Sequence, residues 1–228
     1  MKPVILYGNN VLARRVFFEC KQKEVDFYVA AFCVDDHFLN GDTFFEGLPL
    51  IAESEILKKY PPDEYDMLSC IDAPTKIRNR LLVYDKLKSM GYFLRNYISP
   101  LAYVSEQVET GENNIILGFS YIFDKVSIGH SNTIRTSVTL GNNCTLGNGT
   151  NIGPGSVIGG FTNIGNSCWF GLNCTINDRL TIADETLVGS GAVVIRNTEQ
   201  YTTYVGNPAK AISYHKDTGI MLKLGQMC

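Results

Sequence analysis

The chain has 228 residues and a formal net charge of −3, which accommodates two modest domains and carries no basic run of the kind that binds nucleic acid. No apolar stretch approaches the roughly 18 residues that cross a bilayer. The first ten residues pass directly into a strand and turn and lack the shape of a signal peptide. We therefore expect a cytoplasmic protein with neither nucleic acid nor membrane as a partner.

The first residues predict a β-α-β unit. Residues 3–7 are an apolar strand that ends at Gly8-Asn9-Asn10, and a helical pattern follows to about Lys23. Residues 26–34 form a second strand, which ends at Asp35-Asp36. The two polar pairs would meet at the carboxyl ends of parallel strands, where α/β sheets bind ligands. Without a GxGxxG motif, a plain turn and a solvated loop remain the alternative interpretation.

The remaining elements of this half continue the α/β pattern. Residues 45–51 indicate a small hairpin or edge element, and Ser54 could cap a helix that runs to Tyr60. Residues 65–71 form a third strand. A helix is predicted over 75–90, with Gly91 as its C-terminal stop. The first domain is therefore expected to be Rossmann-like.

A six-residue repeat runs without insertion from Val104 to Val194. Every sixth residue is apolar at fifteen of sixteen positions, Thr110 being the exception, and glycine often follows. A period of six fits neither a helix nor simple strand alternation, so it requires a larger unit of short strands and tight turns. The repeat predicts a parallel β-helix whose aliphatic and small residues point inward, with glycine relieving strain near the corner.

The seven cysteines include no CxxC pair and are odd in number, which indicates neither a disulfide framework nor a zinc cage. Cys144, Cys168 and Cys174 fall at the small inward position of the repeat, where packing is the expected role. After Val194 the frame stops. Residues 215–228 have modest helical character and could cover the open end of the coil.

The hexads LGNNCT, LGNGTN, IGPGSV, IGGFTN, IGNSCW and FGLNCT resemble those of left-handed β-helix acyltransferases. In that family three hexads form one triangular coil and three subunits form a trimer. An α/β unit before such a coil, the IRNRL helix, the ISPLAYVS entry and the YVGNPAKAI tail resemble bacterial sugar acyltransferases. These include sialic acid O-acetyltransferases and nucleotide-amino-sugar N-acetyltransferases. The implied division is 1–98 for nucleotide-sugar binding, 99–212 for the acyltransferase β-helix and 213–228 for a C-terminal tail.

We expect three groups of binding residues, of which the nucleotide and coenzyme A groups are implied by the resemblance. Those facing the nucleotide by position are Gly8, Asn9, Asn10, Asp35, Asp36, Ile71 and Asp72. Arg135 and Asn151 occupy outward places near Asn142, and we expect them to contact the acceptor sugar or its phosphate. Those expected to bind coenzyme A at successive coil corners and in the tail are Gly160, Gly171, Leu172, Gly189, Ser190 and Lys210. The first turn departs from the family's GxxGHG pattern, since this chain reads GNNVLAR, which leaves the nucleotide open.

The most important departure from the family is that this chain lacks its catalytic histidine. The ungapped register puts Asn142 at its position, and an amide cannot act as a general base near neutral pH. One interpretation is catalysis without a histidine, which favours an amine acceptor. A second gives the base role to His130, twelve residues earlier and two triangle faces away, through a neighbouring subunit. A third is a protein that has lost acyl transfer and only binds a nucleotide sugar.

A carbonic anhydrase site is excluded, because its zinc needs three protein ligands, typically histidines, and the only histidine of the coil is His130. We therefore expect an α/β Rossmann-like domain followed by a left-handed parallel β-helix, forming a homotrimeric N-acyltransferase. Acetyl-CoA would be the donor, with no metal, and a nucleotide-linked amino sugar the acceptor for surface glycan synthesis. The alternatives are a sialic-acid-type O-acetyltransferase and the non-catalytic binding protein.

Overall fold

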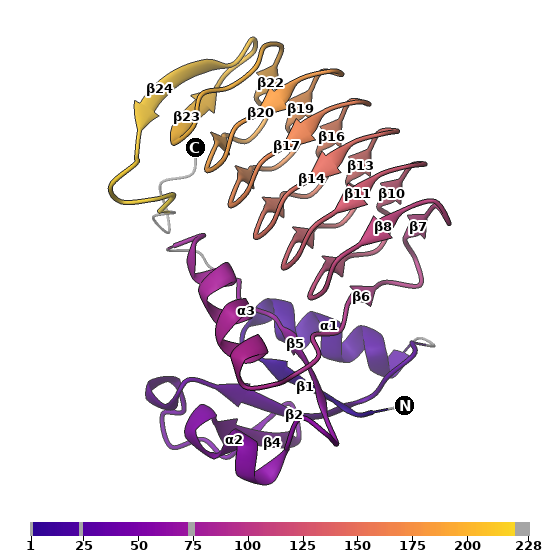
Figure 1. The fold of residues 1–228 in the computed structure, drawn as a ribbon, viewed down its shortest axis with the longest axis vertical. Helices are drawn as coiled ribbons and strands as arrows, with labels where there is room; N and C mark the ends of the chain where they lie inside the picture. Colours follow the sequence, from indigo (N-terminus) through magenta and orange to yellow (C-terminus); the bar gives the residue numbers. More distant parts are fainter. Residues whose placement is uncertain (1, 23–24, 73–75, 222–228) are drawn as a thin grey trace.

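The fold was obtained as a computed structural model that describes residues 2–22, 25–72 and 76–221. An α/β part and a long coil of short strands follow one another along the longest axis of the molecule (Figure 1). No helix among the described residues is long and apolar enough to cross a membrane.

The α/β part has one five-stranded sheet, in the order β3-β4-β2-β1-β5. All its pairings are parallel except that of β3 with β4, the predicted edge hairpin. Alternate residues of β1 enter different cores: Val4 and Leu6 pack with α1, whereas Ile5 and Tyr7 face the side of α2 and α3. The elements are β1 (Val4–Tyr7), α1 (Val11–Gln22), β2 (Val29–Val34), the 3-10 turn η1 (Asp36–Phe38), β3 (Phe44–Phe45), β4 (Leu48–Ala52), α2 (Glu53–Lys59), β5 (Asp66–Ser69) and α3 (Asn79–Ser89).

Two predicted helix ends have different outcomes. Gly91 follows the last residues of α3 with φ +92°, as the predicted stop requires. Ser54 does not cap α2, because the helix begins one residue earlier, at Glu53. The carboxylate of Asp36 instead accepts hydrogen bonds from the Ser54 backbone N–H at 3.1 Å and from its hydroxyl. A side chain from the loop after β2 therefore satisfies the start of α2.

The second half is the predicted parallel β-helix. Each strand from β7 to β22 has two residues and ends at one of the sixth-residue positions. Tyr103 pairs with Tyr121 and Tyr121 with Thr139, so neighbours in a sheet are 18 residues apart and one coil contains three hexads. Three parallel sheets result, and this repeated arrangement fits a left-handed β-helix.

The strands of the coil and its end are β6 (Tyr97–Ile98), β7 (Tyr103–Val104), β8 (Glu109–Thr110), β9 (Ile115–Ile116), β10 (Tyr121–Ile122), β11 (Ser127–Ile128), β12 (Thr133–Ile134), β13 (Thr139–Leu140), β14 (Thr145–Leu146), β15 (Asn151–Ile152), β16 (Val157–Ile158), β17 (Asn163–Ile164), β18 (Trp169–Phe170), β19 (Thr175–Ile176), β20 (Thr181–Ile182), β21 (Leu187–Val188), β22 (Val193–Val194), β23 (Thr202–Val205) and β24 (Lys210–Tyr214). β6 already pairs with β9, and β23 and β24 extend the same sheet at the far end.

The coil core is a column of aliphatic side chains beside small ones. Cys144, Cys168 and Cys174 lie in it, buried as predicted, and burial raises the pKa of the Cys174 thiol to about 11. The glycines have a role other than the one predicted. A Cβ on Gly141 would lie 2.6 Å from the backbone nitrogen of Gly160 in the next coil. The glycines thus permit close stacking of coils, whereas Asn143 and its equivalents take the positive φ at the corner.

Helix α3 fastens the two parts together (Figure 1). The buried guanidinium of Arg80 donates to the carbonyl oxygens of Ile71, in the α/β part, and Ser131, in the coil. Burial lowers the pKa of Arg80 to about 10, so the group stays charged. It also donates to the hydroxyl of Thr133. Because Arg80 bonds to both parts, Ile71, just after β5, is joined to the coil through this side chain.

The C-terminal segment differs from its prediction within the described residues. His215–Met221 contains turns and no helix, and residues 222–228 lie outside the described part. The segment returns to α3: Ile77 donates to the carbonyl of Ile220, and Arg78 donates to that of Lys216. The end of the coil is extended by the β23–β24 hairpin instead.

Candidate active site

A cavity of about 570 Å³ lies at the carboxyl ends of β1, β2 and β5, where the parallel sheet predicted a ligand crevice. The predicted nucleotide-facing residues that line it are Gly8, Asn9, Asn10, Asp35, Ile71 and Asp72. Residues that the sequence did not single out are Tyr7, Val34, His37, Phe38, Asn79, Leu82 and Val83.

The first turn brings backbone close to the cavity. Gly8 has φ +126°, and a Cβ there would lie 3.4 Å from the carbonyl oxygen of Cys70. Asn10 caps α1, because its Oδ1 accepts the Ala13 N–H at 3.0 Å while its Nδ2 donates to the Cys70 carbonyl at 2.9 Å. The positive end of a twelve-residue helix thus borders the cavity, an arrangement that suits phosphate.

The prediction that Asp36 faces the nucleotide is wrong. Its carboxylate binds Ser54, and these hydrogen bonds hold the pKa of Asp36 below its usual range. It does not line the cavity, whereas its neighbour Asp35 does. Consecutive residues in this loop project differently, so one of the paired acids faces the ligand space and the other caps α2.

One wall of the cavity is aromatic and aliphatic. The rings of His37 and Phe38 lie 3.9 Å apart, and Phe38 and Leu82 are both mostly exposed. The Asp35 carboxylate lies 3.1 Å from His37 Nδ1 and 3.9 Å from the ammonium of Lys86. A flat apolar wall beside a carboxylate is suited to a nucleoside, with the ring on the wall and its polar edge or ribose on the acid. The HF dipeptide directly after Asp35-Asp36 was the available sequence signal.

Near Asp35, the polar side chains of Tyr7, Glu53 and Lys86 bond to one another. The hydroxyl of Tyr7 donates to the carboxylate of Glu53, which also pairs with Lys86. Burial, and next the bond to Glu53, raise the pKa of Tyr7, so the phenol stays neutral. Lys86 lies 3.1 Å from the Tyr7 oxygen. These contacts join β1, α2 and α3 beside the cavity.

The cavity connects to the coil through an ion pair. Asp72, on its rim, pairs with Arg135, which follows β12. The guanidinium of Arg135 also donates to Oδ1 of Asn151 at 3.1 Å. The structure therefore brings Asp72, predicted to face the nucleotide, together with Arg135 and Asn151, predicted to contact the acceptor sugar or its phosphate.

Asn142 lies at a different corner of the same triangle. We call the turns after β10, β13, β16 and β19 the Asn142 corner; its stacked residues are Asp124, Asn142, Gly160 and Asp178. Oδ1 of Asn142 accepts the backbone N–H of Asp124 at 3.2 Å. The prediction that Arg135 and Asn151 point outward near Asn142 is wrong. Arg135 follows β12 and the buried Asn151 lies in β15, in the sheet whose Thr133 bonds to Arg80 of α3. Within one chain, Asn142 and the cavity are thus on different faces.

His130 lies at the third corner, as its register predicted. Its Nδ1 accepts the backbone N–H of Glu112 at 2.9 Å, and the hydroxyl of Tyr84 is 3.2 Å away. Asn148 and Asn166 occupy the same place in the next coils, and each accepts a backbone N–H through Oδ1. The structure does not bring His130 and Asn142 together in one chain.

The predicted coenzyme A residues divide between two corners. Leu172 N–H donates to Oγ of Ser190 at 3.1 Å, so these two stack, with Gly171 and Gly189 beside them. Gly189 also bonds to Tyr204 in the hairpin that carries Lys210. The predicted grouping of Gly160 with Leu172 at one corner is wrong. The two residues are 12 apart and not 18, and Gly160 stacks on Asn142 at the other corner. Within one chain, Gly160 and the remaining residues cannot line a single groove.

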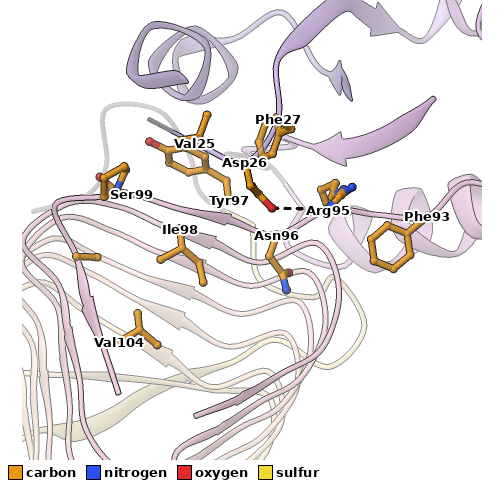
Figure 2. A pocket seen from close by; sticks show the side chains of 12 residues that line it. Val25, Asp26, Phe27, Phe93, Arg95, Asn96, Tyr97, Ile98, Ser99 and Val104 are labelled. Carbon is orange, nitrogen blue, oxygen red and sulfur yellow. Dashed lines mark ion pairs between the residues drawn. The ribbon is translucent and has the colours of Figure 1, made fainter. Parts of the chain in front are cut away.

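A second hollow of about 580 Å³ separates the α/β part from the first coil and contains none of the predicted residues. Figure 2 shows Asp26 and Arg95 facing one another across it, with Ile98 and Val104 on the coil side. Arg95 also pairs with the buried Asp66 at 2.8 Å. Its guanidinium is thus neutralised by the protein. Among the described residues, no three His, Cys, Asp or Glu side chains are grouped as metal ligands.

No family model and no curated protein matches the chain. Solved structures do. PerB from Caulobacter crescentus, in complex with CoA and GDP-perosamine, has a TM-score of 0.82 and 25% identity over 93% of this chain and 98% of that one. Two further structures carry Asn or Ala in place of one histidine of that perosamine N-acetyltransferase, each also with CoA and GDP-perosamine.

Two other solved structures share the fold. The acetyltransferase domain of PglB from Neisseria gonorrhoeae has a TM-score of 0.82 and 20% identity over 93% of this chain and all of that one. WeeI from Acinetobacter baumannii has a TM-score of 0.80 and 21% identity, with the same coverage of both chains. The likeness predicted from the hexads and the preceding α/β unit is confirmed.

Proposed function

We propose that this chain, a hexapeptide-repeat sugar acyltransferase, transfers an acyl group from coenzyme A to the amine of a sugar carried on a nucleotide. Acetyl-CoA is the proposed donor, and surface glycan synthesis the proposed use of the product. The likeness to PerB over nearly the whole chain carries the proposal. The cavity at the α1 N-terminus supplies a place for the nucleotide.

The two halves divide the work in this proposal. Residues 1–98, as a Rossmann-like domain, bind the nucleotide: phosphates at the Gly8-Asn9-Asn10 turn and the nucleoside between Asp35 and the His37–Phe38 wall. Residues 99–212 carry the acyltransferase site, and 213–228 form the tail. Asp72, Arg135 and Asn151 lie where the nucleotide ends and are proposed to contact the sugar or its phosphate.

A second chain is needed to complete this site. The cavity and Asn142 lie on different faces of one chain, so a neighbouring coil must bring its Asn142 corner to the cavity. The same packing would place Gly160 of one chain opposite Leu172, Ser190 and Lys210 of the next, on two walls of one coenzyme groove. We therefore propose a homotrimer acting in the cytoplasm.

The chemistry suits an amine. Attack on a thioester forms a C–N bond and releases the thiol, and an unprotonated amine needs no base to become a nucleophile. A hydroxyl must lose its proton as it attacks. Asn142 can donate through Nδ2 to the oxyanion but cannot remove a proton. O-acetylation is therefore the weaker alternative. A protein that binds the nucleotide sugar without turnover is the other.

A thiol-release assay with acetyl-CoA and a panel of GDP-, UDP- and dTDP-linked amino sugars tests the proposal. Release with one amino sugar, and none with its hydroxyl counterpart, is the expected result. In parallel, calorimetry measures the binding of coenzyme A and of each nucleotide sugar. Binding of a nucleotide sugar with neither binding nor turnover of coenzyme A would overturn the enzyme assignment and leave the binding protein.

A further inference from the structure

A carboxylate stands beside Asn142 at the corner proposed for the reaction. Asp124 precedes Asn142 by 18 residues and stacks beneath it, with its backbone N–H on Oδ1 of Asn142 at 3.2 Å. Both side chains are exposed. On the other side of Asn142 the corner residue is Gly160, whose lack of a side chain leaves the amide uncovered. The corner therefore presents an acid and an amide next to one another.

The carboxylate of Asp124 is oriented by the coil. Oδ1 accepts a hydrogen bond from the hydroxyl of Ser105 at 2.5 Å, and Ser105 is buried. Among the described residues, Oδ2 of Asp124 has no donor and the carboxylate has no ion-pair partner. One oxygen is thus fixed by the protein, and the second is available to another molecule.

We propose that Asp124 is the proton acceptor of this enzyme, in place of the histidine that Asn142 replaces. The inference rests on the proposed acyl transfer. The sugar nitrogen attacks the thioester carbon, and Nδ2 of Asn142 donates to the resulting oxyanion. Asp124 takes the proton that the nitrogen must lose. The C–S bond then breaks, and the proton passes to the departing sulfur, so the products are the amide and free thiol.

The hydrogen bond between the two residues explains their division of roles. Because Oδ1 of Asn142 faces the Asp124 N–H, its Nδ2 is left as the donor for the oxyanion. The Asp124 carboxylate lies near the phenol of Tyr103, whose ring stacks on that of Tyr121, and Glu106 also lies near Tyr103. The neighbouring phenol, and also Asp124, raise the pKa of Tyr103, so it stays protonated and is no rival base near neutral pH.

The test compares Asp124→Asn with Asp178→Asn. Asp178 is an exposed acid at the same corner, two coils beyond Asn142, and serves as the matched control. Asparagine at 124 retains an oxygen for Ser105 and removes only the basic group. We expect kcat to fall at least about 100-fold in Asp124→Asn, with KM for both substrates within about threefold and Asp178→Asn unchanged. Circular dichroism confirms that each variant is folded.

A second variant separates proton transfer from structure. Asp124→Ala leaves space at the carboxylate position, and added formate is expected to restore turnover there. The turnover of Asp178→Ala should match wild type with and without formate. Chloride at equal ionic strength should restore nothing. If Asp124→Asn retains more than a third of wild-type kcat, or formate has no effect on Asp124→Ala, the proposal is overturned while acyl transfer by the wild type stands. Wild-type protein that releases no thiol with any amino sugar overturns both.

Discussion

Nδ1 of His130 accepts the backbone N–H of Glu112, 18 residues earlier, at 2.9 Å. This nitrogen therefore carries no proton and does the same work as the side-chain oxygens of Asn148 and Asn166 in the next coils. The only histidine of the coil thus belongs to a ladder of side chains that satisfy backbone amides. Its role as a base stays a prediction, and the ladder supplies a structural alternative.

The ladder predicts that His130→Asn is tolerated, since Asn offers an oxygen at the same place. His130→Ala removes the acceptor and should lower the free energy of unfolding by about 1 kcal/mol, measured by urea denaturation. Turnover should change less than about threefold in either variant. A loss of about a hundredfold in both would restore His130 as the general base.

Asp36 should contribute stability only above the pH at which it titrates. Its hydrogen bonds with Ser54 lower its pKa, so the folded state holds the carboxylate deprotonated more strongly than the unfolded state does. The contribution is complete above the unfolded value of about 4 and is lost as pH falls through the lower folded value. The Tm difference between wild type and Asp36→Ala should therefore be constant from pH 5 to 7 and shrink below about pH 4. A constant difference down to pH 3 would contradict the assignment.

Arg135 should matter for the nucleotide sugar and not for the fold of the nucleotide cavity. Arg135→Ala breaks the pair with Asp72 and the bond to Asn151. We expect its affinity for the nucleotide sugar, measured by calorimetry, to fall about tenfold. Arg78→Ala, which breaks an ion pair with Glu185 away from the cavity, is the control. Equal affinities in Arg135→Ala and wild type would remove Arg135 from the acceptor site.

Asn142→His should place an imidazole, a stronger base than the Asp124 carboxylate, at the corner that the proposed mechanism uses. N-acylation is expected to persist, while activity toward the matching hydroxyl acceptor should emerge, because a hydroxyl needs proton removal as it attacks. In the Asp124→Asn background the same change should recover N-acylation. If neither gain occurs, Asn142 does not mark the reaction centre.

Asp35 lines the cavity whereas Asp36 bonds to Ser54, and the sequence alone does not predict this difference. The pair follows a buried strand, so its position at the ligand edge was predictable from strand order alone. Which acid faces the cavity was not, because Ser54 is 18 residues away and its backbone N–H becomes available to Asp36 only when α2 packs against β2. The same limit applies to Gly160, which was grouped with Leu172 by hexad position although only residues 18 apart share a corner.

The sequence by itself determined the β-helix, its unbroken frame from Val104 to Val194, the α/β unit before it and the absence of a histidine at position 142. These follow from periodicity and residue type, which are local properties. Only the tertiary structure decided that Arg135 meets Asp72, that His130 serves a backbone amide and that Asp124 lies beneath Asn142. Each contact joins residues 18 or more apart, and the stacking of coils and the docking of α3 bring them together.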